Sequence, residues 1–391
     1  MRKSISMLST FPPTHCGIAT FAQSLSDALA RHDTEVRRIA LDYDGELSDG
    51  NGFAALHRGA IDTSTTARSI NDAELAIIQH EFGIFSGDSG EDVLAIIDGV
   101  GVPIITVLHT VPATPQSPQR RILQRLLDIS DAIVVLSYSA ARVLRHAYEV
   151  RPRSVHVIPH GSTDLWAKRR HAPATHAPRL LTWGLIGRGK GLESALHALA
   201  HIDDLDPRPE YVIAGSTHPK VHRHEGDRYR EELQELARTL GVADQVHFVD
   251  GYLDDERLAN LVSHADAFVL PYDNDEQVTS GVLVEALAAG GPVIATRFPH
   301  ARELLANGTG LLVNRRDPAQ LGEAIRVIAS QPARTRVMRD ASIAASRDFL
   351  WHRVADDYLT LADELTTFDE RRLVPRPVIQ IPAPVATGTG W

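Results

Sequence analysis

The chain has 391 residues, of which 43% are hydrophobic and 23% are charged, so it is long enough for two buried cores and is expected to fold along most of its length. Its formal net charge of −10 argues against a dedicated nucleic-acid-binding protein, and its single cysteine, Cys16, excludes an internal disulfide framework. Because no uncharged apolar run is long enough to span a membrane and the N-terminus is too polar for a signal peptide, we expect a cytoplasmic protein.

Apolar runs alternate with helical patterns through the first 160 residues. In the segments between the runs, apolar residues recur with a period near 3.6, which predicts helices. The predicted strands cover 5–9, 75–78, 104–108, 132–136 and 155–158, and the predicted helices cover 18–29, 93–97, 121–127 and 139–147. Continuous apolar strands separated by helices indicate a parallel, doubly wound α/β sheet that is buried on both faces.

A polar segment with two prolines, 168–178, reads as a linker, and a second series of the same kind follows it. Its predicted strands cover 180–184, 211–214, 246–248, 267–270 and 293–296, and its predicted helices cover 192–200, 228–240, 255–263, 279–289, 318–329, 335–349 and 351–366. The Pro-rich end of the chain reads as a disordered tail. The predicted organisation is a first domain over 1–170, a second over 171–348, a closing helix over 349–366 and a tail over 367–391.

One stretch of the second half, 271–296, has the pattern of a ligand site. It begins where a predicted strand ends, crosses a polar loop and enters a helix at about 279–281, which carries Glu285 near its start and ends at Gly290 and Gly291. Open α/β sheets bind ligands at the carboxyl edge of their strands. The amides of a helix start at that edge would suit a phosphate group.

Five segments resemble, in order and spacing, those of one enzyme family. They are VIPHGSTD at 157–164, WGLIGRGKGLESALHAL at 183–199, HFVDGYLDDERLANLVSHADAFVLP at 247–271, the stretch 271–296 and FLWHRVADDYL at 349–359. Together they resemble the retaining GT-B glycosyltransferases of family 4. The resemblance implies two Rossmann-like domains that face each other across a cleft, with a C-terminal helix that crosses back onto the first domain. It also implies a nucleotide-sugar substrate.

The sequence departs from the family pattern at three positions. The family signature has two acids eight positions apart, and here the second is Glu285 but the first falls on Gln277. The usual arginine before the phosphate-binding lysine falls on Leu185, with Arg188 nearby as a substitute. The first glycine of the usual N-terminal Gly-Gly loop is Cys16, which leaves Gly17.

The candidate donor-binding residues carry positive charge or offer close backbone approach. Lys190 is the first candidate for the diphosphate and Arg188 the second, because a metal-free site needs cations or helix-start amides to stabilise that leaving group. The alternative for both is a surface turn with solvated charges. The resemblance implies that Ser280 and Gly281 offer backbone amides to the donor.

Glu285 is the candidate for the ribose hydroxyls, by the same resemblance. Its alternative role is to stabilise the helix dipole. Gly17 would allow the backbone of the first domain to approach the donor, and Cys16 beside it is interpreted as a packing residue.

The candidate catalytic residues are His109, Gln277 and Glu276. His109 follows a predicted strand and resembles a family histidine that lies near the transferred sugar. Gln277 can orient sugar hydroxyls but cannot ionise, so Glu276 would have to supply any negative charge beside the anomeric carbon. His80 and Glu81 follow another predicted strand and are assigned to acceptor recognition.

The acidic loop Asp273-Asn274-Asp275 looks like a metal-binding motif of another glycosyltransferase fold, but we interpret it as mainly solvated. We therefore expect no metal and no other cofactor. The expected function is transfer of a hexose from a nucleotide-diphosphate sugar, of the GDP-mannose or UDP-glucose type, to a carbohydrate or small-molecule acceptor, with peripheral membrane contact left open. The alternatives are a sugar-nucleotide epimerase, a sugar phosphorylase and an inactive nucleotide-sugar-binding protein.

Overall fold

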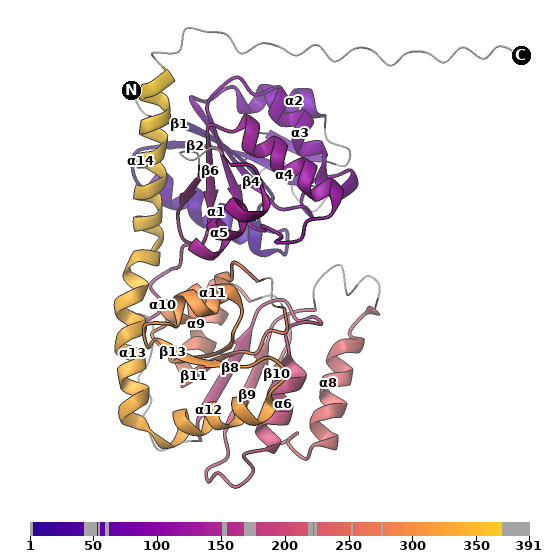
Figure 1. The fold of residues 1–391 in the computed structure, drawn as a ribbon, viewed down its shortest axis with the longest axis vertical. Coiled ribbons are helices and arrows are strands. Elements are labelled where there is room, and N and C mark those ends of the chain that lie inside the picture. Colours follow the sequence, from indigo (N-terminus) through magenta and orange to yellow (C-terminus); the bar gives the residue numbers. More distant parts are fainter. Residues whose placement is uncertain are drawn as a thin grey trace, which may run out of the picture.

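A computed structural model of the chain describes residues 3–42, 53, 55–58, 62–150, 155–167, 177–217, 222, 225–251, 253–274 and 277–369. It contains two parallel β-sheets, each covered by helices, which form two Rossmann-like domains stacked along the long axis of the molecule (Figure 1). The predicted α/β fold with two such domains is confirmed. The predicted linker lies largely outside the described residues, and the exact domain limits stay predictions.

The first sheet has seven strands in the order β3-β2-β1-β4-β5-β6-β7. Helices α2, α3, α4 and α5 pack on one face, and α1 and α14 pack on the other, so the central strands are buried on both faces. The strands are β1 (Ser4–Ser9), β2 (Glu35–Asp42), β3 (Ala55–Arg58), β4 (Leu75–His80), β5 (Ile104–Leu108), β6 (Ala132–Val135) and β7 (Val155–Val157). The helices are α1 (Gly17–Ala30), α2 (Thr63–Ile70), α3 (Asp92–Asp98), α4 (Ser117–Ile129) and α5 (Tyr138–Ala147).

The second sheet has six strands in the order β10-β9-β8-β11-β12-β13. Helices α6, α8 and α12 pack on one face, and α9, α10 and α11 on the other. The strands are β8 (Arg179–Trp183), β9 (Glu210–Ala214), β10 (Val246–Val249), β11 (Ala267–Leu270), β12 (Val293–Thr296) and β13 (Gly310–Val313). The helices are α6 (Leu192–Ala200), α8 (Arg228–Thr239), α9 (Asp255–His264), α10 (Gly281–Ala288), α11 (Pro299–Leu304), α12 (Pro318–Ser330) and α13 (Pro332–Ser346).

Among the described residues, five strands and α-helices were not predicted from the sequence, namely β2, β3, α2, α11 and β13. The first half of β2 is polar and only partly buried, so it lacks the apolar run of the central strands. Helix α11 has six residues and β13 has four, which is too short for a periodic pattern to show. These short elements matter for function, because α11 contacts both the first domain and the predicted ligand stretch.

The closing helix α14 (Trp351–Asp369) crosses from the second domain to the first and packs beside α1 (Figure 1). Its apolar face belongs to the same core as strands β1, β4 and β5, and includes Trp351, Val354, Ala355, Tyr358, Leu361 and Ala362. The prediction that a C-terminal helix crosses back is therefore confirmed. The helix extends three residues beyond the predicted end at 366, and residues 370–391 lie outside the described part of the chain.

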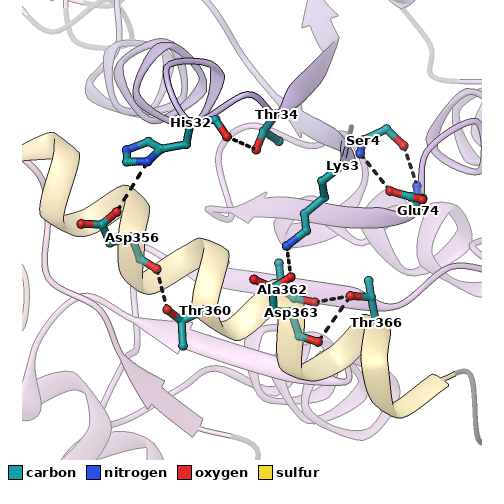
Figure 2. A network of polar contacts seen from close by, with 10 residues as sticks. All are labelled: Lys3, Ser4, His32, Thr34, Glu74, Asp356, Thr360, Ala362, Asp363 and Thr366. Atoms are coloured by element: carbon teal, nitrogen blue, oxygen red, sulfur yellow. Dashed lines mark hydrogen bonds and ion pairs between the residues drawn. The ribbon is translucent and has the colours of Figure 1, made fainter. Parts of the chain in front are cut away.

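Polar contacts line the exposed edge of this packing (Figure 2). The Lys3 ammonium donates to the Asp363 carboxylate, and Nδ1 of His32 lies 3.6 Å from Oδ1 of Asp356. Exposed polar contacts of this kind contribute roughly 0–1 kcal/mol each, so the buried apolar face of α14 is the main contribution to holding the helix in place.

Hydrogen bonds also join the two domains where β6 ends. Backbone N–H groups of Tyr138 and Ser139, at the start of α5, donate to the Glu303 carboxylate of α11 at 3.0 and 2.7 Å. The Ser137 hydroxyl donates to the main-chain oxygen of Val278 at 2.6 Å. A carboxylate of the second domain thus caps a helix of the first.

We expect Glu303→Ala to lower the free energy of unfolding by about 1 kcal/mol, because a lost helix cap and a lost charge at a helix N-terminus each cost about that much or less. Urea unfolding of the two proteins measures this difference. The matched control is Glu323→Ala on α12, where the glutamate pairs with Arg326 of its own helix. Equal stability of Glu303→Ala and the control would contradict the interdomain role of this cap.

Candidate functional site

The phosphate-binding loop predicted after β8 lies against the loop that follows β11. Gly191, the N-cap of α6, has a φ of 67°, and a Cβ atom there would lie 1.8 Å from the main-chain oxygen of Pro271. The N–H of Asp273 donates to the main-chain oxygen of Gly189 at 2.9 Å. Only glycine at 191 permits this close approach, which brings the two stretches singled out in the sequence together.

The structure places the two cationic candidates in different surroundings. The Lys190 ammonium lies 4.3 Å from the centroid of the Tyr272 ring and has no carboxylate partner among the described residues. Arg188 is half-exposed, and its guanidinium bonds Glu232 of α8 at 2.8 Å, which raises its pKa. Lys190 is therefore available to an anionic ligand, whereas Arg188 is already paired with acidic side chains.

Glu285 is held by a residue that the sequence did not single out. The indole N–H of Trp183, the last residue of β8, donates to Oε2 of Glu285 at 3.0 Å. Glu285 is the fifth residue of α10, and the first turn of that helix contains no acid. The alternative role of Glu285 in stabilising the helix dipole therefore loses its geometric basis, since that effect falls off within the first turn.

The start of α10 differs from the expectation in one respect. The N–H of Ser280 donates to Nδ1 of the buried His300 at 2.9 Å, so this amide is not free for a donor. The Ser280 hydroxyl instead accepts from the N–H of Leu283 at 3.2 Å and caps the helix. The N–H of Gly281 has no acceptor within the described part of the chain, which leaves it as the amide that could face a ligand.

Gly281 lies next to the interdomain turn. A Cβ atom at this position would be 2.6 Å from Nε2 of His160, so glycine is required for the contact. His160 in turn bonds the main-chain oxygen of Gly161 through Nδ1 at 2.7 Å. The start of α10 is thereby placed against the segment that joins the two domains.

Gln277, at the position of the first signature acid, is half-buried and its amide turns back onto its own loop. The side-chain NH₂ donates to the main-chain oxygen of Thr279, and the main-chain oxygen of Gln277 accepts from the N–H of His300 at 3.4 Å. Glu276 and Asp275 lie outside the described residues, so the roles given to them stay predictions.

In the first domain, His109 follows β5 and is fixed by Gln79 of β4. Nε2 of His109 and Oε1 of Gln79 lie 2.8 Å apart, and the ring meets the Phe21 ring edge-on at 4.8 Å. An amide oxygen can only accept, so His109 carries its proton on Nε2 and keeps Nδ1 as an acceptor. Burial lowers the pKa of His109 to about 3, which makes the ring neutral near pH 7.

The two residues assigned to acceptor recognition lie differently. His80 is fully buried, with its ring between Phe82 and Phe85, so it can touch an acceptor only if the side chain becomes exposed. The Glu81 carboxylate accepts from the N–H of Phe82 at 2.9 Å and from the Thr110 hydroxyl. Both assignments stay predictions.

Gly17 is the first residue of α1, and the space where its Cβ would lie has no atom within 4 Å. A ligand can therefore approach the backbone here. Cys16 is the N-cap of the same helix, and its Sγ accepts from the N–H of Ala19 at 3.3 Å. The sulfur therefore caps the helix, and its interpretation as a packing residue stays a prediction.

The acidic loop after β11 is engaged with arginines. The Asp273 carboxylate bonds Nε of Arg316 at 2.7 and 2.9 Å, and the Asp273 main-chain oxygen accepts from Arg315. Among the described residues, no group of three or more His, Cys, Asp or Glu side chains is arranged to hold a metal ion. That a metal is not needed stays a prediction.

Four histidines lie close to where the two domains meet: His80 and His300 are buried, and His109 and His160 are half-buried. Desolvation is the main reason for the low pKa of each: about 3 for His80, His109 and His300, and about 4 for His160, against an ordinary 6.5. The unfolded chain therefore binds more protons than the folded protein between pH 6.5 and 4. Stability should be complete above pH 6.5 and decline below it, by up to about 1.4 kcal/mol per pH unit for each histidine.

Urea unfolding at pH 7.5, 6.0 and 5.0 measures this decline. His80→Leu should reduce its slope by about a quarter, because one of the four groups is removed. A free energy of unfolding that stays constant from pH 7.5 to pH 5.0 would contradict the buried neutral histidines.

Sequence reasoning missed Trp183, Gln79, His300 and Glu303. Trp183 and Gln79 are the last or next-to-last residues of strands, and His300 follows β12 by four residues. The rule that found His109, a polar group at the carboxyl edge of a parallel sheet, applies to them as well. Glu303 gave no signal, because its partner is a helix in the other domain.

Two family models match consecutive parts of the chain. The model described as Glycosyltransferase Family 4 matches residues 16–162, and the model described as Glycosyl transferases group 1 matches residues 167–344. A D-inositol 3-phosphate glycosyltransferase of Corynebacterium efficiens is 27% identical over 299 residues, which is 70% of this chain and 69% of that protein.

Solved structures show the same fold. Sucrose-phosphate synthase from Thermosynechococcus elongatus has a TM-score of 0.75 at 20% identity, over 94% of this chain and all of that one. HepE of Anabaena, solved in complex with UDP and glucose, has a TM-score of 0.71 at 15% identity, over 93% of this chain and all of that one.

Two Rossmann-like domains that meet at their carboxyl edges, joined by a crossing C-terminal helix, define the GT-B class of glycosyltransferases. Within that class, the chain belongs to the group 1 and family 4 glycosyltransferases, enzymes that use nucleotide sugars. In the described part of the chain, no helix combines the length and the apolar character that a membrane span requires.

Proposed function

We propose that the protein transfers a hexose from a nucleoside-diphosphate sugar, of the GDP-mannose or UDP-glucose type, to a carbohydrate or small-molecule acceptor, with retention of the anomeric configuration. The observation that carries this proposal is the Lys190 ammonium, which has no carboxylate partner among the described residues and lies on the loop that rests against Pro271. In a site without a metal, this charge would stabilise the diphosphate as it leaves.

The other groups at the junction suit the remaining parts of such a donor. The Glu285 carboxylate, oriented by Trp183, would accept hydrogen bonds from the ribose hydroxyls. The N–H of Gly281 at the start of α10, which has no acceptor among the described residues, would donate to a phosphate oxygen. From the first domain, the acceptor nitrogen of neutral His109 would bind a sugar hydroxyl, and Gly17 would allow the backbone to approach.

The similar proteins support the proposed class of sugar donor more than they support any particular acceptor. The HepE structure contains UDP and glucose, and the names of the other two relatives refer to different compounds, D-inositol 3-phosphate and sucrose phosphate. Acceptors are read by the loops of the first domain, which is the part of the site where this sequence shows least of the family pattern. The single cysteine fits a reducing compartment, so we include a cytoplasmic location in the proposal.

The proposal is tested by incubating the protein with UDP-, GDP- and ADP-sugars in the presence and absence of sugars and polyols. We expect acceptor-dependent release of the nucleoside diphosphate, an α-linked product from an α-linked donor by NMR, and no loss of rate in EDTA. Conversion of the donor sugar without an acceptor would instead indicate an epimerase. Dependence on inorganic phosphate would indicate a phosphorylase, and absence of all turnover an inactive binding protein.

A further inference from the structure

His300 connects a short helix to both ends of the loop that precedes α10. Its Nδ1 accepts from the N–H of Ser280 at 2.9 Å, and its own N–H donates to the main-chain oxygen of Gln277 at 3.4 Å. The residue is 2% exposed. One buried residue of α11 therefore fixes the two ends of the segment 277–281, which we call the donor loop.

The donor loop is also tied to the first domain, since the Ser137 hydroxyl donates to the main-chain oxygen of Val278 at 2.6 Å. Within the loop, the Gln277 amide donates to Thr279, and the buried Thr279 hydroxyl has no partner within the described residues. Without an acceptor at His300, the N–H of Ser280 would also be buried and unpaired, which is unfavourable by about 1–3 kcal/mol. The loop would then relax into another conformation in which this N–H finds a partner.

The position of the donor loop determines where the N–H of Gly281 and the carboxylate of Glu285 lie. Gly281 is the last residue of the loop and lies against His160, so a shift of the loop moves the N–H of Gly281. Glu285 is one turn further along the same helix and bonds Trp183. Both groups were assigned to the donor above, whereas His300 itself is buried and bonded to the loop.

The hydrogen bond also defines which form of the ring is needed. Because an N–H donates to Nδ1, this nitrogen carries no proton, and the proton of the neutral ring is on Nε2. Burial lowers the pKa of His300 to about 3, so this form persists across the physiological range. The function of the ring depends on an acceptor at the reach of Nδ1, and an asparagine side chain can place its oxygen at a similar distance from the backbone.

We propose that His300 is a positioning residue for the nucleotide-sugar donor, which acts by fixing the donor loop so that Gly281 and Glu285 are correctly placed. This inference rests on the proposed function, but it makes a prediction that can be tested separately. The donor should be affected by changes at His300, whereas the acceptor, which is bound from the first domain, should not.

The test compares His300→Leu, His300→Asn and His300→Gln with the wild-type protein. The measurements are kcat, KM for the donor, KM for the acceptor, and the calorimetric Kd for UDP and GDP, whichever binds. We expect the leucine variant to raise the donor KM and the nucleotide Kd by about tenfold or more, because one buried hydrogen bond is lost. The acceptor KM should stay unchanged. Asparagine should restore both values to within about threefold, and glutamine, whose oxygen is at the reach of Nε2, should not.

The matched control is His264→Leu, because the His264 ring bonds Asn260 of its own helix at 2.7 Å and touches none of the site residues. Equal donor KM and Kd for asparagine, glutamine and leucine would overturn the inference, as would a leucine variant with wild-type values. If the leucine variant does not fold, the difference between asparagine and glutamine decides. Absence of wild-type turnover would count against the proposed function, while the Kd values would still test the positioning role.

Discussion

Lys190→Met is expected to reduce kcat/KM for the donor by about 100-fold or more while the protein stays folded. The ammonium is the one cationic group of the phosphate loop that is not paired with an acid in the described part of the structure. Removing a preorganised charge from a developing anion typically lowers the rate by about 10²–10³. Steady-state kinetics with the active nucleotide sugar measures the change, and circular dichroism confirms the fold.

Two comparisons sharpen this result. Lys190→Arg keeps the charge and should recover part of the lost activity. Arg188→Ala should have a smaller effect than Lys190→Met, because the Arg188 guanidinium already bonds the Glu232 carboxylate, whereas Lys190 has no carboxylate partner among the described residues. A larger loss in Arg188→Ala than in Lys190→Met would contradict the placement of Lys190 at the diphosphate.

Glu285→Ala is expected to raise the donor KM and to lower kcat/KM by about 10- to 100-fold, because hydrogen bonds to a charged group contribute about 1.5–3 kcal/mol. The affected contacts are those proposed for the ribose hydroxyls. Kinetics with the nucleotide sugar and with its 2′-deoxyribose analogue measures them. The wild-type protein should discriminate between the two donors, and the variant should not.

The control for Glu285 is its partner. Trp183→Phe removes the indole N–H that orients the carboxylate but keeps an aromatic ring against Phe268. We expect a smaller loss than in Glu285→Ala, since the carboxylate remains. Undiminished discrimination between the ribose and deoxyribose donors in Glu285→Ala would remove Glu285 from the site.

The sequence predicted the architecture well because buried parallel strands leave a strong local pattern. Runs such as those of β4 and β11 are apolar on both faces, and the apolar face of α14 repeats with the helical period. Elements with little local pattern were missed. Strand β2 begins with exposed and half-buried polar residues, and α11 is too short for its period to be seen.

The candidate site was predictable only in outline. Lys190 and Glu285 stand out by motif and by their place after strands, and the structure leaves both near the same loop junction. The pairing of Arg188 with Glu232 and the use of the Ser280 amide by His300 depend on side chains 44 and 20 positions away. No local pattern encodes such contacts. Spacing alone therefore could not distinguish an N–H or cationic group that is available to a ligand from one that already bonds another part of the protein.

The structure also changes the interpretation of Gln277, which replaces the first acid of the family signature. As a sequence feature it suggested a lost acid beside the anomeric carbon. In the fold, the residue is part of a loop whose two ends are held by His300, and its amide bonds that loop. Gln277 and His300 should therefore be studied together, since substitutions of residues in one hydrogen-bonded network are not additive.

The central claim is that Lys190 and Glu285 form one binding site for a nucleoside diphosphate. Calorimetric titration of the wild-type protein, Lys190→Met and Glu285→Ala with UDP, GDP and ADP tests it most directly. We predict saturable one-to-one binding of at least one nucleotide to the wild-type protein, weakened about tenfold or more in each variant. Absence of binding to the wild-type protein, or equal affinity in all three proteins, would contradict the claim.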